Sequence, residues 1–157
     1  MSSLFIDPFI LDYVTYVYLA IGLGMLVGLL FSETLGVMGG GVIVPGYFAM
    51  HLQDFSSIIL TFLIAYITFL IIHILSKYLL IYGRRRVILS LLIAFLIGLI
   101  FRQSIFINYP IDYIGFIIPG LIASWMDKQG ITRTISVVLI QSSIVHFILM
   151  LIYISNV

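Results

Sequence analysis

Charged residues divide this chain into long uncharged runs, and the lengths of those runs predict where its helices lie. Residues 13–32, 55–76 and 134–154 contain no Asp, Glu, Lys or Arg. A helix needs about 20 apolar residues to cross the roughly 30 Å of a bilayer's hydrocarbon core. These three runs therefore predict three transmembrane helices. The shorter run 87–101 predicts a fourth helix over about 85–105, since the arginines before it can extend their apolar stems toward the interface.

Two further apolar segments, 34–53 and 113–126, are poor candidates for continuous helices because glycine and proline interrupt both. The first contains Gly36, Gly39, Gly40, Gly41, Pro45 and Gly46, and the second contains Gly115, Pro119 and Gly120. In a helix interior Gly costs about 1 kcal/mol and Pro about 3 kcal/mol relative to Ala. Irregular backbone at membrane depth persists where protein or a water-filled cavity surrounds it. We therefore expect two broken or re-entrant segments between the long helices.

The two segments repeat one pattern, because GVIVPGYFA at 41–49 and GFIIPGLIA at 115–123 share Gly-x-Ile-x-Pro-Gly-x-x-Ala. Upstream, MLVGLLF at 25–31 matches FLIGLIF at 95–101, although Leu- and Ile-rich helices also resemble one another by chance. The pattern predicts a duplication in which each half reads helix, broken segment, helix. The predicted parts are repeat 1 at about 13–76, a linker at 77–86 and repeat 2 at about 87–154, within one membrane domain, 1–157.

We expect an all-α integral membrane protein with four long transmembrane helices and two Pro-Gly-broken short segments. Lys77 and the arginines 84–86 place the central connection in the cytoplasm by the positive-inside rule. If both broken segments cross the membrane, the halves are inverted, the termini lie outside, and Lys128 and Arg133 lie inside. If the segments are re-entrant, the halves are parallel, both termini are cytoplasmic, and Lys128 and Arg133 lie outside. The inverted arrangement is favoured because it satisfies the positive-inside rule.

The composition supports a membrane setting and excludes several kinds of binding site. Hydrophobic residues make up 63% of the chain and charged residues 8%, and the mean hydropathy is +1.30. An ordinary soluble domain has about a quarter charged residues, so this chain lacks the polar surface that water requires. The net charge of +1 supplies no bulk electrostatic attraction for nucleic acid. The absence of cysteine excludes disulfides and thiolate metal sites.

No pattern of catalytic residues stands out in the sequence. His51, His73 and His146 lie far apart without acidic partners at ligand spacing, so we interpret them as packing or hydrogen-bonded residues. There is no nucleophile elbow, phosphate-binding loop or paired-carboxylate motif, and GVMGGGVIVPG does not match a dinucleotide fingerprint. We therefore expect this chain to have no catalytic residues, cofactor or metal of its own.

Glu33 and the cluster of Arg84, Arg85 and Arg86 are the candidate polymer- or partner-binding residues. Glu33 ends the first span, where it either marks a helix end or lies at the mouth of the broken segment. The arginines either anchor the topology or bind carboxylates bidentately, in a polyanion or in a partner protein.

These motifs together resemble a known family, the small membrane subunit of bacterial poly-γ-glutamate synthase and capsule systems (the PgsC/CapC family). The resemblance is carried by Glu33, Gly36, VPGY at 44–47, LIYGRRR at 80–86, IIPGLIA at 117–123 and QG at 129–130. In order and spacing the resemblance covers roughly residues 18–153. The first dozen residues look like an extension, and Gly39-Gly40-Gly41 and Arg86 look like local variations.

The resemblance implies a non-catalytic, multi-pass subunit in the lipid bilayer of the bacterial cytoplasmic (inner) membrane. It implies association with a cytosolic ATP-dependent amide ligase, related to Mur ligases, that joins glutamates through their γ-carboxylates. It also implies a further membrane-anchored capsule subunit that helps deliver the anionic polymer outward. Some capsule operons of this type have been assigned to other products, so the resemblance identifies the complex better than its polymer.

We therefore expect this chain to anchor the ligase and to help form the polymer export path. Its broken-segment motif would line that path or shape the docking face, and comprises Gly41, Pro45, Gly46, Tyr47, Gly115, Pro119 and Gly120. The arginines 84–86 would receive the nascent polymer or the ligase, and a chain this small would form a homo-oligomer to enclose a path. The alternatives are a small stand-alone membrane transporter or channel, and a scaffold that conducts nothing.

Overall fold

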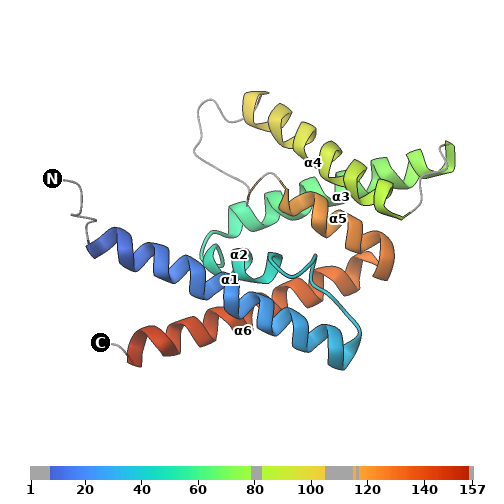
Figure 1. Cartoon of the computed structure of the whole chain (residues 1–157). Helices are drawn as coiled ribbons and strands as arrows, with labels where there is room; N and C mark the ends of the chain where they lie inside the picture. The colour runs from blue at the N-terminus through green and yellow to red at the C-terminus, as the bar shows by residue number, and fades with distance from the viewer. Residues whose placement is uncertain (1–7, 79–82, 105–114, 116, 156–157) are drawn as a thin grey trace, which may run out of the picture.

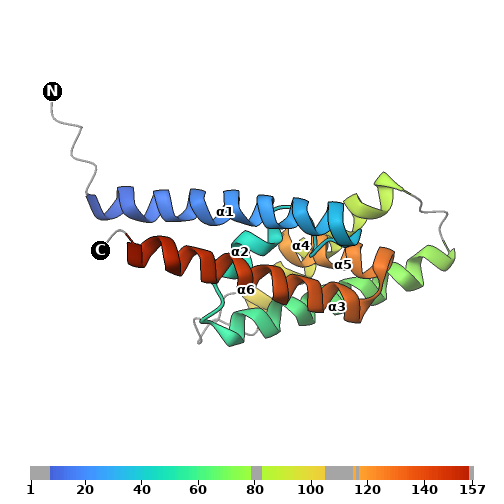
Figure 2. The ribbon, with the colours of Figure 1, turned by 90° about the horizontal axis from the view of Figure 1, so that it is seen from below.

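The computed structural model describes residues 8–78, 83–104, 115 and 117–155, and within these ranges every regular element is a helix. The helices are α1 (Pro8–Leu35), α2 (Val44–Met50), α3 (Phe55–Tyr78), α4 (Arg84–Ser104), α5 (Ile118–Gln129) and α6 (Ile131–Ser155). The predicted all-α class is therefore confirmed. Figures 1 and 2 show an elongated bundle in which the long helices α1 and α6 lie side by side.

Three of these helices contain segments long and apolar enough to cross a membrane: Tyr13–Leu35, Phe55–Tyr78 and Ile131–Ile152. They coincide with the three long uncharged runs, as predicted. Only 22–33% of the residues in their most apolar stretches are buried, and large side chains such as Leu26 and Ile59 are exposed. Apolar surface on this scale suits lipid and not water. Helix α4 lies within one residue of its predicted bounds, and its crossing of the membrane stays a prediction.

The Pro-Gly pairs begin short helices, which corrects the expectation that they lie within breaks. Helix α2 has seven residues and α5 has 12, and in each the proline sits in the first turn. Proline is tolerated there because the first N–H groups of a helix have no intrahelical partner to lose. The irregular backbone lies upstream at 36–43, so 34–53 is not a continuous helix, as predicted. Helix α5 continues past the predicted limit of 113–126 to Gln129, and residues 113, 114 and 116 lie outside the described residues.

The glycines of the two pairs allow the short helices to touch the long ones. A Cβ atom on Gly46 would lie 2.6 Å from the Ala20 carbonyl oxygen of α1. One on Gly120 would lie 2.8 Å from the Ser90 carbonyl oxygen of α4. Gly24 on α1 faces the same contact, since its Cβ would lie 2.5 Å from the Gly46 nitrogen. Small residues permit this backbone approach between membrane helices, so packing requires glycine at both pairs.

Each short helix is held between long helices from both halves of the sequence. Helix α2 packs against α1 and α6, and α5 packs against α4 and α3, while α1 contacts α6 and α3 contacts α4 (Figure 1). A core shared by α2, α3, α5 and α6 consists of Val44, Phe48, Ile58, Ala65, Ile118, Ile122, Met126 and Val138. Such packing supplies the van der Waals attraction that holds helices together in lipid.

One side chain fastens the irregular segment 36–43 to α5. Gln129 Nε2 donates to the Met38 carbonyl oxygen at 2.6 Å, and the Met38 N–H donates to Gln129 Oε1 at 3.3 Å. Backbone groups that leave the helical pattern inside a membrane need such partners. Close to the same segment, the fully buried Gln141 of α6 has no hydrogen-bond partner for its amide among the described residues.

Candidate functional site

One end of the bundle collects most of the basic residues of the chain. The C-terminal ends of α1, α3 and α5 and the N-terminal ends of α4 and α6 lie there together (Figures 1 and 2). Six of the seven Lys and Arg residues belong to these helix ends, namely Lys77, Arg84, Arg85, Arg86, Lys128 and Arg133. Glu33 and Asp127 are acidic residues of the same helix ends. We call this region the basic end.

The opposite end of the bundle carries both terminal helix ends and the turn between α2 and α3 (Figure 1). Asp54 lies in that turn, directly before α3. Lys and Arg are concentrated on the cytoplasmic side of membrane proteins, whereas Asp and Glu contribute little to orientation. The distribution therefore predicts that the basic end faces the cytoplasm.

A cavity of about 190 Å³ lies at the basic end between α3, α4 and α5. Its lining combines apolar, charged and hydroxyl groups, from Ile72, Gly83, Arg86, Val87, Ser90, Ala123, Ser124, Asp127 and Lys128. These residues come from three helices and from the turn before α4, so only the folded chain brings them together. Two cationic side chains and one carboxylate belong to the lining, and this is the candidate functional site.

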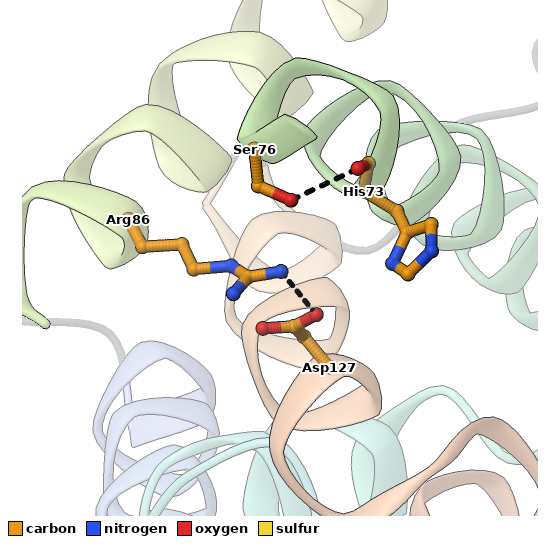
Figure 3. A network of polar contacts seen from close by, with 4 residues as sticks. All are labelled: His73, Ser76, Arg86 and Asp127. Carbon is orange, nitrogen blue, oxygen red and sulfur yellow. Dashed lines mark hydrogen bonds and ion pairs between the residues drawn. The ribbon is translucent and has the colours of Figure 1, made fainter. Parts of the chain in front are cut away.

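Arg86 and Asp127 form an ion pair between α4 and α5 (Figure 3). Arg86 Nη2 donates to Asp127 Oδ1 at 2.5 Å, and the two side chains are 27% and 15% exposed. Removal of one partner costs about 3–5 kcal/mol in a fully buried pair, and less at this exposure. The Nε atom of Arg86 is buried and has no partner among the described residues. Beside the pair, at the end of α3, Ser76 Oγ donates to the His73 carbonyl oxygen at 2.9 Å (Figure 3).

The two serines of the cavity present oxygen lone pairs and not free protons. The one hydroxyl proton of Ser90 is shared between the carbonyl oxygens of Val87 and Gly120, at Oγ···O distances of 2.7 and 3.1 Å. Ser124 Oγ donates to the Leu121 carbonyl oxygen at 2.8 Å. A hydroxyl has one proton and two lone pairs, so each serine oxygen is left as an acceptor.

Arg86 is the predicted binding residue that lines the cavity. Arg84 and Arg85 are exposed in the first turn of α4, and Glu33 is exposed near the end of α1. The fold thus brings all four residues to the same end of the bundle, although Glu33 lies far from the arginines in sequence. Their roles in binding stay predictions.

No residue of the broken-segment motif belongs to this cavity lining, although the carbonyl oxygen of Gly120 accepts a hydrogen bond from Ser90 of the lining. Pro45, Gly46, Pro119 and Gly120 are buried between helices. Gly41 and Tyr47 are half-buried, and Gly115 is exposed. The motif therefore shapes helix packing at its Pro-Gly pairs. Its role in a polymer path stays a prediction.

Sequence reasoning did not select Asp127, Lys128, Ser90 or Ser124 as site residues. Asp127 and Lys128 carried a signal, because ionisable residues that directly follow an apolar segment are candidates for a functional role. Lys128 Nζ lies 4.5 Å from the centroid of the Trp125 ring, a cation–π contact that positions the ammonium group. The serines carried no signal, since hydroxyls are common in membrane helices.

Two histidines form the hydrogen bonds that their isolation in the sequence suggested. His51 Nδ1 donates to the Tyr47 carbonyl oxygen and His146 Nδ1 donates to the Ala49 carbonyl oxygen, each at 3.0 Å. The second bond joins α6 to the end of α2. His73 is exposed on α3.

The membrane-length helices and the concentration of positive charge at one end define an all-helical membrane protein. Comparison with known proteins identifies its family. The family model for capsule biosynthesis CapC matches residues 23–135. This chain therefore belongs to the capsule biosynthesis CapC family, as its motifs indicated. No solved structure matches it.

Two relatives extend this assignment over nearly the whole chain. The "PGA biosynthesis protein CapC" of Bacillus subtilis (strain 168) is 34% identical over 145 residues, which cover 87% of this chain and 94% of that protein. The "Capsule biosynthesis protein CapC" of Bacillus anthracis is 29% identical over 141 residues, which cover 87% of this chain and 95% of that protein. These similarities support a role in capsule biosynthesis.

Proposed function

We propose that this chain is the membrane subunit of a bacterial poly-γ-glutamate or capsule polymer synthase, and that its basic end docks the ATP-dependent amide ligase. Relatives named for PGA and capsule biosynthesis support this class of function. The observation that carries the docking role is the basic end, where the ends of α3, α4, α5 and α6 carry six of the seven Lys and Arg residues. Such a surface attracts a polyanion and an acidic face of a partner protein.

In the proposed orientation the basic end faces the cytoplasm, where ATP and the ligase are present. Arg84 and Arg85 are exposed there, and guanidinium groups bind carboxylates through paired hydrogen bonds. The exposed Glu33 supplies a carboxylate for a basic side chain of the ligase. A further membrane-anchored capsule subunit delivers the polymer outward from this complex.

The proposed topology is an inverted repeat in the cytoplasmic membrane, in which four long helices cross and both short segments complete a crossing. One support is that the N-terminal end of α1 and the C-terminal end of α6 lie opposite the facing ends of α3 and α4, while the α5–α6 turn lies on the same side as those ends (Figure 1). The re-entrant alternative would place the α5–α6 turn on the side opposite these ends of α3 and α4. A second support is that two equivalent close contacts occur at matching places in the two sequence repeats. Gly46 packs against the Ala20 carbonyl oxygen, and Gly120 packs against the Ser90 carbonyl oxygen.

The export path in this proposal lies between copies of the chain. The cavity at the basic end measures about 190 Å³, whereas a path for an extended polymer has to cross roughly 30 Å of hydrocarbon. A charged polymer does not cross hydrocarbon unaided. A homo-oligomer would enclose a path, with the irregular segment 36–43 in its wall, since such backbone is tolerated beside a water-filled cavity.

Removal of charge at Arg84 and Arg85 tests the docking role. We expect Arg84→Gln with Arg85→Gln to lower the amount of ligase recovered with the chain about tenfold, because two ion pairs of roughly 0.7 kcal/mol each are lost. Polymer yield should fall with it. The measurement is affinity capture of the tagged chain from capsule-producing cells in mild detergent, followed by quantification of the bound proteins.

The matched control makes the same change in net charge at the opposite end. Gln53→Glu with Ser56→Glu adds two negative charges at exposed positions beside the α2–α3 turn, and should leave capture and yield unchanged. If the arginine variant also keeps wild-type capture and yield, the docking role is wrong. A chain that purifies only with itself from polymer-producing cells would favour a stand-alone transporter or channel.

A further inference from the structure

We infer that the cavity between α3, α4 and α5 binds the headgroup of one anionic phospholipid, in which a singly charged phosphodiester is joined to a hydroxyl-bearing group. Phosphatidylglycerol has this chemistry. The phosphodiester lies against Arg86 and Lys128, and a headgroup hydroxyl lies against Asp127. This binding goes beyond the proposed function, because it requires only that the basic end lies at the membrane surface and involves neither the ligase nor its polymer.

The polar part of the cavity lies at the level of the lipid headgroups. Arg86 belongs to the first turn of α4, and Asp127 and Lys128 belong to the last turn of α5. Ile72 of the lining lies six residues before the end of α3, which is about 9 Å along the helix axis. The headgroup region is roughly 5–8 Å thick on each side of the hydrocarbon core. The cavity therefore has its charges among the lipid phosphates and Ile72 just inside the hydrocarbon.

The charges of the lining balance one phosphodiester. Arg86 and Lys128 supply two positive charges and Asp127 supplies one negative charge, so the lining has a net charge of +1. A phosphodiester has one negative charge, and a zwitterionic headgroup has no net charge. A phosphate monoester has a charge of about −1.5 to −2, which would leave an excess of negative charge beside Asp127. The lining therefore favours a phosphodiester lipid with no positive charge in its headgroup.

Each partner of the ion pair keeps one accessible polar atom for a ligand. Arg86 Nη2 and Asp127 Oδ1 bond to each other (Figure 3), and Arg86 Nε is closed off. Arg86 Nη1 and Asp127 Oδ2 have no hydrogen bond within the described chain, and neither is among its buried atoms without a partner. These two atoms therefore retain accessible surface, in side chains that are 27% and 15% exposed. A phosphodiester oxygen accepts from Nη1, and a headgroup hydroxyl donates to Oδ2.

Lys128 adds an exposed positive charge to the lining. Its Nζ lies 4.5 Å from the centroid of the Trp125 ring. A cation–π contact of this kind positions an ammonium group without neutralising its charge. Tryptophan is enriched where helices pass the headgroup region, and Trp125 is the one tryptophan of this chain. The pair therefore supplies a cation at the level of the lipid phosphates.

The size of the cavity is sufficient for a headgroup and not for a whole lipid. Its 190 Å³ exceeds the roughly 150 Å³ of an engineered cavity that accommodates benzene, and it is partly open. A phosphate group with part of its headgroup alcohol fits this space. The acyl chains remain outside, against exposed apolar side chains of the same helices such as Ile74 of α3 and Ile88 of α4.

The test counts the lipids bound to the purified full-length chain in uncharged detergent, by native mass spectrometry during a lipid titration. The probes are dioleoyl-phosphatidylglycerol and dioleoyl-phosphatidylcholine, which have the same acyl chains and different headgroups. We expect the wild-type chain to bind phosphatidylglycerol about tenfold more tightly, the factor of one charge-assisted hydrogen bond. Lys128→Gln should lower this preference about fivefold, since one basic residue contributes roughly that factor at a membrane surface. Arg133→Gln is the matched control, because it removes the same charge outside the cavity, and should leave the preference unchanged.

A third lipid tests the hydroxyl contact with Asp127. Dioleoyl-phosphatidylmethanol has the same singly charged phosphodiester and no hydroxyl, so the wild-type chain should bind it less tightly than phosphatidylglycerol. Asp127→Ala should bind these two lipids equally, because the acceptor for the hydroxyl is gone. Both lipids have the same charge, so the comparison within one variant cancels the change in protein charge. If Asp127→Ala does not fold, the wild-type comparison and Lys128→Gln still decide.

Equal binding of phosphatidylglycerol and phosphatidylcholine by the wild-type chain would overturn the lipid site. Equal weakening by Lys128→Gln and Arg133→Gln would also overturn it, because the attraction would then belong to the basic end as a whole. Displacement of phosphatidylglycerol by inorganic phosphate at equal concentration would identify a free-phosphate site instead. Equal wild-type affinity for phosphatidylglycerol and phosphatidylmethanol would reject the hydroxyl contact with Asp127.

Discussion

Replacement of Gly120 by alanine tests how closely the short helices approach the long ones. A Cβ atom at this position would lie 2.8 Å from the Ser90 carbonyl oxygen and 2.8 Å from Leu91 Cα, both main-chain atoms of α4. Ordinary van der Waals contact begins near 3.4 Å, so α4 and α5 would have to separate by roughly half an ångström. Main-chain atoms in a helix cannot rotate away as a flexible side chain can.

The expected cost is about 2 kcal/mol in the free energy of unfolding. Overpacking of a close contact costs about 1–3 kcal/mol. Separation of the helices also lengthens the 3.1 Å hydrogen bond from Ser90 Oγ to the Gly120 carbonyl oxygen, which contributes about 1 kcal/mol. Against these costs, Ala is favoured over Gly within a helix by about 1 kcal/mol. The Tm should therefore fall by about 4–8 °C for a chain of this length.

Thermal unfolding in detergent, followed by the fluorescence of Trp125, reports on α5 itself, because the chain has one tryptophan. Gly22→Ala is the matched control, since a Cβ there meets open space and the Tm should stay the same or rise. Gly46→Ala should behave like Gly120→Ala, because its Cβ would lie 2.6 Å from a carbonyl oxygen of α1. If the Gly120→Ala protein is as stable as the Gly22→Ala protein, the close contact between α4 and α5 is refuted.

Two polar side chains of the interior give further predictions. Gln129→Ala should destabilise the chain by about 1–3 kcal/mol and speed hydrogen exchange of the Met38 amide, because both main-chain groups of Met38 lose their partner. Unchanged exchange at Met38 would contradict this role. Gln141→Leu should leave the Tm unchanged or raise it in the same unfolding assay, because the buried amide has no partner among the described residues. A loss above about 2 kcal/mol would show that the amide is paired.

The helices were predictable because the length and composition of an apolar run are local properties. Helices α1, α3 and α6 contain the three uncharged runs, and α4 matches the prediction made from the run after the arginines. The irregular segment was predictable for the same reason. Gly36, Gly40 and Gly41 adopt positive φ angles of 63°, 75° and 113°, which residues with a Cβ resist.

The role of the Pro-Gly pairs was not predictable from propensity alone. Proline and glycine disfavour a helix interior, but the same residues are accepted in a first turn and at a close helix contact. Which of these applies depends on the neighbouring helix. Gly46 and Gly120 belong to the second case because main-chain atoms of α1 and α4 lie against them.

The sequence by itself determined that this chain is apolar and helical, because bilayer thickness and side-chain hydropathy act on each segment separately. Its motifs by themselves indicated the CapC family. Only the tertiary structure decided which charges meet. Arg86 pairs with Asp127, 41 positions away, and Gln129 bonds to Met38, 91 positions away. Such contacts depend on how the helices pack, and packing also gathers basic residues from the ends of four helices, α3 to α6, at one end of the bundle.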